Sequence, residues 1–152
     1  MSGKLGKLLG ANLEIREGNW AALGPEASEI RRVVFIEEQH VPLEEEWDGR
    51  DPECRHFLAL LDGREVGTAR LLPDAHIGRV AVLSEARGAG VGAALMRAAI
   101  DAARRLGHPQ VELAAQTHAL DFYSRLGFEA YGPEFLDAGI LHRNMRLTLP
   151  CR

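Results

Sequence analysis

The chain has 152 residues, which favours one domain with room for a buried core. Hydrophobic residues make up 46% of the chain and charged residues 26%, so the composition excludes fibrous and intrinsically disordered proteins. The formal net charge of -4 offers no basic surface for nucleic acid. Cys54 and Cys151 lie too far apart in the sequence to suggest a disulfide framework or a metal site.

Apolar runs in the sequence are too short to span a membrane, and the N-terminal residues lack the apolar stretch of a secretory signal. We therefore expect a cytoplasmic protein that binds neither a membrane nor nucleic acid. Residues 1–12, rich in glycine and lysine, are expected to form a flexible tail. No repeat or linker divides residues 13–152, which are expected to form a single domain.

The first half of this domain predicts one helix among four strands. Apolar residues that recur near one helical face predict a helix from Pro25 to about Gln39. Asp62-Gly63, a strong turn signal, separates two apolar runs and predicts a β-hairpin. The predicted strands cover residues 13–16, 57–61, 66–72 and 77–82, and the last of them is expected to be a central strand.

The second half predicts two helices and three strands. Leu95, Ala98 and Ala102 recur at helical spacing after a glycine-rich turn, and Gly107 supplies a C-terminal stop. The predicted helices cover residues 91–106 and 119–126, and the predicted strands cover residues 111–114, 128–131 and 142–149. The full order is one strand, a helix, three strands, a helix, a strand, a helix and two strands. This order predicts an α/β fold in which helices pack on a mixed sheet (α+β).

The turn at residues 87–92 (RGAGVG) follows a short apolar strand and opens a helix. Glycines let a phosphate approach the backbone, N–H groups of the first helical turn point toward it, and Arg87 adds a positive charge. The turn therefore predicts a pyrophosphate site, although a turn that only packs the helix on the sheet is the structural alternative. No Gly-Lys-Ser/Thr follows, which argues against NTP hydrolysis. Residues 88–93 match a relaxed dinucleotide fingerprint, but too little α/β sequence follows for a second nucleotide-binding half.

Two sequence blocks resemble the GCN5-related N-acetyltransferase (GNAT) family. Arg87-x-x-Gly90-x-Gly92, preceded by a strand, resembles the family motif Arg/Gln-x-x-Gly-x-Gly/Ala. Residues 116–128 resemble the family segment Asn-x-x-Ala-x-x-Phe-Tyr-x-x-x-Gly-Phe, with Gln116 in place of the asparagine. The likeness extends from about residue 13 to residue 149, and segments 34–39, 67–71 and 138–143 resemble the YjcF/ElaA-like branch of the family.

This resemblance implies an acyl-CoA N-acyltransferase fold, with a central, mostly antiparallel sheet flanked by helices. It implies acetyl-CoA as cosubstrate, no metal, and as acceptor a primary amine of a small molecule, a peptide or a protein lysine. A homodimer would be in line with the family. The residues that the resemblance places against the coenzyme are Val80, Ala81, Val82, Arg87, Gly88, Ala89, Gly90, Val91, Gly92, Gln116, Ala119 and Tyr123.

Direct transfer needs a neutral amine and a proton for the departing thiolate. Tyr123 is expected to be the general acid, because a phenol with a pKa of about 10 is a neutral donor near pH 7. Packing of the short helix is the structural alternative for this residue. Some family members place a glutamate early in the strand before the loop, and His76 has that position here. We expect His76 to be the general base, and an exposed turn residue is the structural alternative. Other candidate bases, acting through a water molecule, are Glu38, Glu44, His118 and His142.

Two other functions stay open on the sequence. Gln116 in place of asparagine, and the lack of that strand glutamate, are compatible with a non-catalytic acyl-CoA-binding module. Phe35, an acidic loop with Asp48 and Asp51, and residues 67–73 resemble acyl-homoserine-lactone synthases, which share the architecture but are longer. Release of free thiol from acetyl-CoA in the presence of an amine would separate an enzyme from a binding module.

Overall fold

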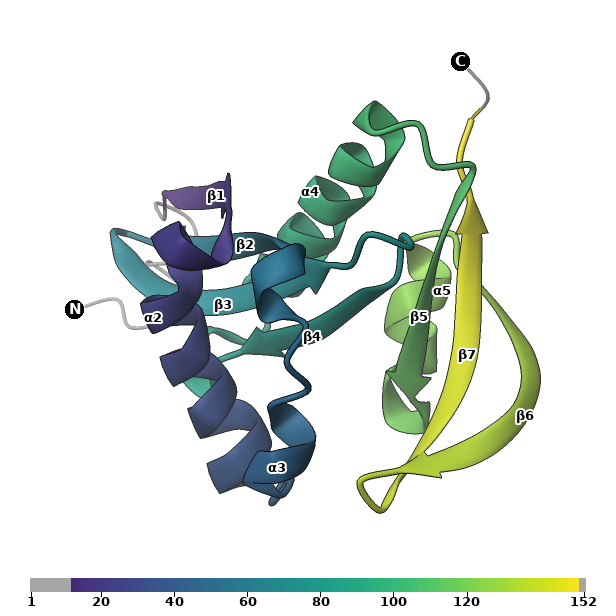
Figure 1. Ribbon diagram of the computed structural model, residues 1–152, viewed down its shortest axis with the longest axis horizontal. Helices are drawn as coiled ribbons and strands as arrows, with labels where there is room; N and C mark the ends of the chain where they lie inside the picture. Colours follow the sequence, from purple (N-terminus) through teal and green to yellow (C-terminus); the bar gives the residue numbers. More distant parts are fainter. Residues whose placement is uncertain (1–11, 151–152) are drawn as a thin grey trace.

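The computed structural model describes residues 12–150, so nearly all of the predicted N-terminal tail lies outside the described residues. Two sheets stand side by side: a four-stranded sheet with the order β1-β2-β3-β4 and a three-stranded sheet with the order β5-β7-β6 (Figure 1). All pairings within both sheets are antiparallel. Among the described residues, no helix is long and apolar enough to cross a membrane.

The observed elements follow the predicted order, with short helical turns added. The strands are β1 (Leu13–Gly18), β2 (Arg55–Leu61), β3 (Arg64–Leu71), β4 (Ile77–Val82), β5 (Gln110–Gln116), β6 (Glu129–Asp137) and β7 (Ile140–Thr148). The helices are α2 (Trp20–Arg31), the π-helix η1 (Arg32–Glu38), α3 (Leu43–Glu46), α4 (Val91–Arg105) and α5 (Leu120–Arg125). Single 3-10 turns are η2 (Asp51–Glu53), η3 (Ser84–Ala86) and η4 (Thr117–Ala119).

Helix α2 begins earlier than the sequence predicted. The Oδ1 atom of Asn19 accepts a hydrogen bond from the Ala22 N–H at 2.9 Å and caps the helix, so the predicted start at Pro25 is wrong. Pro25 lies inside the helix instead. The chain then continues without a break into the π-helix η1, which ends at Glu38. Winding of this kind is rare and is found often at functional sites.

The four-stranded sheet is covered on both faces. Side chains alternate along a strand, so Phe57 and Ala59 of β2 face one core while Leu58 and Leu60 face another. Helix α4 packs on the first of these faces and α2 on the second (Figure 1). Both helices therefore have fixed positions relative to the strands that carry the predicted site.

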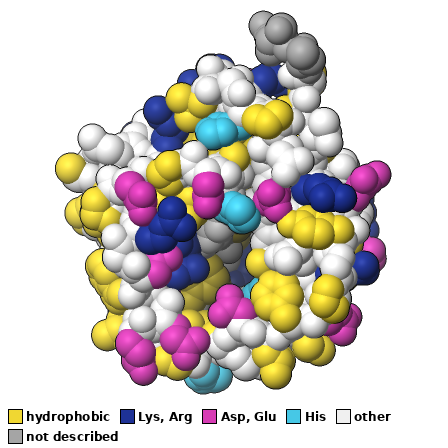
Figure 2. Space-filling view, turned by 45° about the vertical axis from the view of Figure 1, so that its right-hand side comes forward, with side chains coloured by type: hydrophobic (Ala, Val, Ile, Leu, Met, Phe, Trp, Pro, Cys, Tyr) yellow, Lys and Arg dark blue, Asp and Glu magenta, His cyan; other side chains and the backbone are white. Residues whose placement is uncertain are grey.

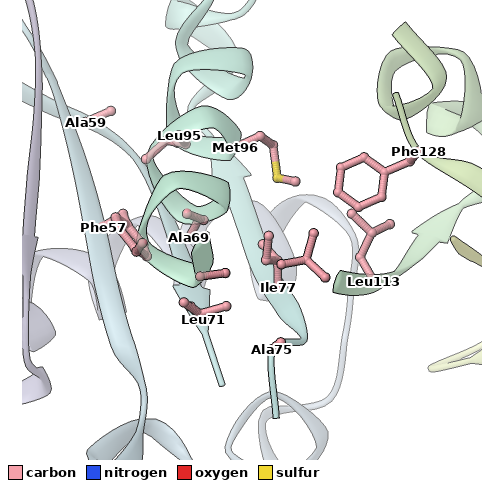
Figure 3. Packing of buried hydrophobic residues seen from close by; sticks show 14 of the residues in the cluster. Phe57, Ala59, Ala69, Leu71, Ala75, Ile77, Leu95, Met96, Leu113 and Phe128 are labelled. Atoms are coloured by element: carbon pink, nitrogen blue, oxygen red, sulfur yellow. The ribbon is translucent and has the colours of Figure 1, made fainter. Parts of the chain in front are cut away.

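The larger core joins the two sheets through α4. Leu95 and Met96 of this helix are fully buried. In Figure 3, Met96 points toward Phe128 and Leu113 of the second sheet region, while Leu95 lies on the side of Phe57. The start of α4, which carries the glycine-rich turn, is thus held against both halves of the fold.

Gly67 is expected to be indispensable for this packing. A Cβ on Gly67 would lie 3.0 Å from side-chain atoms of both Leu95 and Val91 and 3.2 Å from the Ala81 carbonyl oxygen. We expect Gly67→Ala to lower the free energy of unfolding by about 1–3 kcal/mol, measured by urea denaturation. Gly78 on the neighbouring strand is the matched control, because a Cβ there would meet nothing within 4 Å. Equal stability of the two variants would contradict the prediction.

The two sheets part between β4 and β5. These strands run parallel, and within residues 12–150 the sheets share one isolated bridge, between His76 and Glu112 near the start of each strand. Just beyond it the β3–β4 register shifts at a bulge that contains Arg79, whose φ is 50°. The strands diverge from there toward Val82 and Gln116, which divides the predicted central sheet in two (Figure 1). We refer to the space between the diverging strands as the β4–β5 opening.

Candidate active site

Two glycines of the loop before α4 take a backbone conformation that glycine adopts without strain. Gly88 has a φ of 83° and Gly90 a φ of 80°, both in the left-handed region. A Cβ at either position would meet no atom within 4 Å, so close packing does not require glycine there. At Gly92, in contrast, a Cβ would lie 3.3 Å from Cζ of Phe122 on α5. The backbone path of the loop, rather than helix packing alone, explains its glycines.

The loop leaves a row of free N–H groups at the start of α4. None of the backbone N–H groups of residues 88–93 donates to an acceptor within the described chain, and the next one, of Ala94, donates to the Gly90 carbonyl oxygen at 3.1 Å. Free N–H groups at the start of a 15-residue helix carry positive partial charge and form a concave anion site. The loop can therefore bind a phosphate or a diphosphate.

Arg87 at the front of this loop has two partners. Its Nε donates to the Val82 carbonyl oxygen at 2.9 Å, and its terminal nitrogens donate to the two carboxylate oxygens of Glu38 at 2.6 and 2.8 Å. The two side chains are 43% and 41% exposed. The hydrogen bond from Arg87 holds the pKa of Glu38 below its ordinary value. The guanidinium group thus links the end of β4 to the end of η1.

The opposite wall of the β4–β5 opening comes from the end of β5. Nε2 of Gln116 donates to Oε1 of Gln39 at 3.0 Å, and Oε1 of Gln116 lies 2.7 Å from Nε2 of His118. Ala119, at the end of η4, is half-buried just beyond. The resemblance places Arg87 and Gln116 against a coenzyme. Arg87 donates hydrogen bonds to Glu38 and Gln116 donates one to Gln39, so the two side chains are held by consecutive residues at the end of η1.

Tyr123 lies on α5 between two phenylalanines. Its ring packs edge-on against Phe122 and Phe128, with ring centroids 4.9 and 6.1 Å apart. Burial raises the pKa of Tyr123 to about 12, so its hydroxyl is protonated at neutral pH. Phe122, the preceding residue of α5, lies against the start of α4, since a Cβ on Gly92 would be 3.3 Å from its ring.

The structure does not bring His76 to the same end of the opening. His76 precedes β4, and six residues of extended strand, about 20 Å, separate it from the loop. Its side chain is exposed, with Nδ1 3.1 Å from a carboxylate oxygen of Asp74. Glu38 pairs with Arg87 beyond the end of β4, and His118 follows the end of β5. His142 is the register partner of Gln116 at the same end of β5, and it stacks on Phe135 with ring centroids 5.8 Å apart. The geometry thus favours Glu38, His118 and His142 over His76 among the candidate bases.

A buried charge cluster that the sequence did not predict lies beside the bulge of β4. Arg31 of α2 donates to Glu46 at 2.5 Å and to Asp51 at 2.8 Å, and Arg70 of β3 donates to Asp51 at 3.0 Å. Each of these four side chains belongs to a residue that is at most 5% exposed. The signal was present in Arg70, because a charge within an apolar strand needs a buried partner.

Asp48 and Arg79 bond to residues of this cluster and extend it to the surface. The side chains of Asp48 and Arg79 are 30% and 25% exposed. Hydrogen bonds from Arg70 hold the pKa of Asp48 well below its usual range, and Arg79 donates to the Glu46 carbonyl oxygen at 3.0 Å. The cluster therefore ties the acidic loop to β3 and to the bulge of β4. Figure 2 shows a hollow between the two halves of the molecule, with acidic, basic and histidine side chains around it.

Comparison with known proteins assigns this arrangement to a family. Residues 24–149 match the model of the acetyltransferase (GNAT) domain. This chain belongs to the GNAT acetyltransferase family. It is 39% identical over 120 residues to the uncharacterized N-acetyltransferase YjcF of Bacillus subtilis, an alignment that covers 76% of this chain and 86% of the relative. The predicted family is therefore confirmed.

Two solved structures confirm the fold and the predicted branch. An acyl-CoA N-acyltransferase from Pseudomonas aeruginosa, 35% identical, superposes with a TM-score of 0.79 over 90% of this chain and 100% of its own. Escherichia coli ElaA, 28% identical, gives a TM-score of 0.79 over 90% of this chain and 99% of its own. Membership in the GNAT family makes this chain an acyltransferase, of a family that uses acyl-CoA and acts on amine acceptors.

Proposed function

We propose that this GNAT acetyltransferase transfers the acetyl group of acetyl-CoA to a primary amine of a small molecule, a peptide or a protein lysine. The observation that carries the proposal is the row of free N–H groups at residues 88–93, which lies behind Arg87 at the wide end of the β4–β5 opening. A diphosphate is the part of coenzyme A that such a row binds. The proposal thus rests on backbone geometry as well as on family membership.

The remaining contacts follow from the two walls of the opening. The backbone of residues 80–82 would bind the pantetheine arm in the manner of an added strand, because β4 is an edge strand on that side. Gln116 and Ala119 would line the other side. A backbone N–H near Val82 would polarise the thioester carbonyl, and loss of one such donor typically costs about 3 kcal/mol of transition-state stabilisation.

The chemistry requires one bond to form and one to break. The bound thioester supplies the acetyl group, whose carbon bonds the amine nitrogen as its bond to sulfur breaks. Tyr123 would donate its phenolic proton to the departing sulfur, as its raised pKa keeps it protonated in the resting state. The amine must lose a proton before or during attack, and Glu38 or His118, at the ends of the diverging strands, would accept it through water.

Coenzyme binding tests the proposed site directly. Gly90→Ala forces a Cβ into a left-handed conformation, so we expect the Kd for CoA, measured by calorimetry, to rise about tenfold. Gly63→Ala is the matched control: Gly63 has a φ of 83° in the β2–β3 turn and is equally free of neighbours, so the strain is alike. The Kd of the Gly63→Ala variant for CoA should equal that of wild type. Wild-type protein that does not bind CoA would refute the proposal.

Turnover separates the proposed enzyme from a binding module. Wild-type protein incubated with acetyl-CoA and a panel of primary amines should release free thiol, and mass spectrometry should find one acetyl group on the acceptor. Saturable CoA binding without thiol release on any amine would favour the module instead.

A further inference from the structure

A short segment spans the wide end of the β4–β5 opening and bonds to both of its walls. Glu38 ends η1 and pairs with Arg87 on the β4 side, while the next residue, Gln39, accepts the hydrogen bond of Gln116 on the β5 side. His40 follows with a φ of 61°, a strained conformation for a residue other than glycine. Residues 38–40 are termed the strap.

The backbone of the strap is anchored independently of the walls. The Gln39 N–H donates to the Val34 carbonyl oxygen at 3.1 Å, and the Val41 N–H donates to the Phe35 carbonyl oxygen at 2.8 Å. In the part of the chain that the structure describes, the hydrogen bonds between strap and walls are made by side chains. The walls can therefore be released while η1 stays folded.

The strap engages the groups that the proposed coenzyme site would use. The carboxylate of Glu38 neutralises Arg87 next to the free N–H groups at residues 88–93. A diphosphate bound to those N–H groups would repel this carboxylate and would offer the guanidinium a bidentate acceptor of higher charge. Because an exposed ion pair contributes little stability, it can be exchanged at small cost.

We propose that Glu38 is a stand-in anion for the coenzyme, which occupies Arg87 in the free protein and yields it to the diphosphate when the coenzyme binds. The exchange frees the strap from the β4 wall. This inference rests on the proposed function and predicts the direction in which Glu38 changes coenzyme affinity. Glu38 competes with the coenzyme for Arg87, so its charge weakens coenzyme binding rather than supporting it.

A charge-removing substitution measures the competition. We expect Glu38→Gln to lower the Kd for CoA about three- to tenfold in calorimetry at fixed ionic strength, since the diphosphate no longer displaces an ion pair or faces a nearby carboxylate. Glu37→Gln is the matched control, because Glu37 is the neighbouring carboxylate on η1 and pairs with Arg32 instead of Arg87. Its Kd should stay within about twofold of wild type.

The same substitution in an Arg87→Gln variant tests whether Arg87 causes the tighter binding. This variant lacks the guanidinium group for which Glu38 and the diphosphate compete, so adding Glu38→Gln should no longer lower the Kd for CoA. The inference is overturned if Glu38→Gln binds CoA no more tightly than Glu37→Gln, or if the gain persists without Arg87. In both cases wild-type CoA binding would leave the proposed function standing, whereas wild-type protein without CoA affinity would overturn both.

Discussion

Replacing Tyr123 by phenylalanine is expected to lower kcat for acetyl transfer by about 100-fold or more, with the Kd for CoA changed by less than about twofold. The change removes one oxygen atom from a ring that stays packed against Phe122 and Phe128, so the fold and the glycine-rich loop are preserved. Without the phenol, the departing thiolate must take its proton from water. The rate of free-thiol release gives kcat and calorimetry gives the Kd for CoA, both measured on the same preparation.

Tyr131→Phe provides the matched control for this prediction. The Tyr131 hydroxyl donates to Glu112, the residue that bridges to His76 at the closed end of the β4–β5 opening, so its loss should leave kcat within about twofold of wild type. The pH dependence of kcat is a second test. Because the pKa of Tyr123 is raised to about 12, ionisation of its hydroxyl should reduce kcat only as the pH approaches that value. Wild-type kcat in Tyr123→Phe would remove this residue from the mechanism.

The glycine-rich loop before α4 could be predicted from sequence because its signals are local. Glycines with positive φ, a helix that starts directly after them and an arginine at the front all lie within residues 87–92. The same holds for the hairpin at Asp62-Gly63 and for the order of strands and helices. The start of α2 also has a local signal, because Asn19 is a residue type favoured at the N-cap, whereas Pro25, the predicted start, lies in the interior of the helix.

The strap and the division of the sheet could not be predicted in the same way. Arg87 lies 49 residues from Glu38, and Gln116 lies 77 residues from Gln39, so neither pair has a sequence pattern. The sheet divides at a bulge around Arg79, a non-glycine residue with a positive φ whose side chain donates to the distant Glu46 carbonyl oxygen. The prediction for His76 depends only on its position in the sequence before β4, and that position does not show that a whole strand separates it from the loop.

Arg31→Met is expected to lower the free energy of unfolding by about 3–5 kcal/mol, the largest stability effect that the structure predicts for a single substitution. Methionine fills a similar volume but removes the cation that bonds to both Glu46 and Asp51, whose side chains are almost fully buried. Asp51 then keeps Arg70 as its hydrogen-bond partner and Glu46 keeps Arg79 at 3.4 Å, so the buried cluster has one uncompensated negative charge. Urea denaturation measures the change. Arg32→Met is the matched control, because Arg32 is the next residue and pairs with exposed glutamates, and its urea midpoint should be close to that of wild type.

The destabilisation caused by Arg31→Met should depend on pH in a direction that identifies its cause. Desolvation raises the pKa of Asp51, but hydrogen bonds from Arg31 and Arg70 outweigh it, so the folded-state pKa lies below its ordinary value. In wild type this carboxylate therefore stabilises the fold at neutral pH, and the contribution is lost as the pH falls below about 4. Without Arg31 the pKa of Asp51 is higher, and protonation relieves the buried charge. The stability gap between variant and wild type should therefore narrow as the pH falls through the pKa of Asp51 in the variant. A gap that does not change with pH would mean that lost packing, not lost charge pairing, causes the destabilisation.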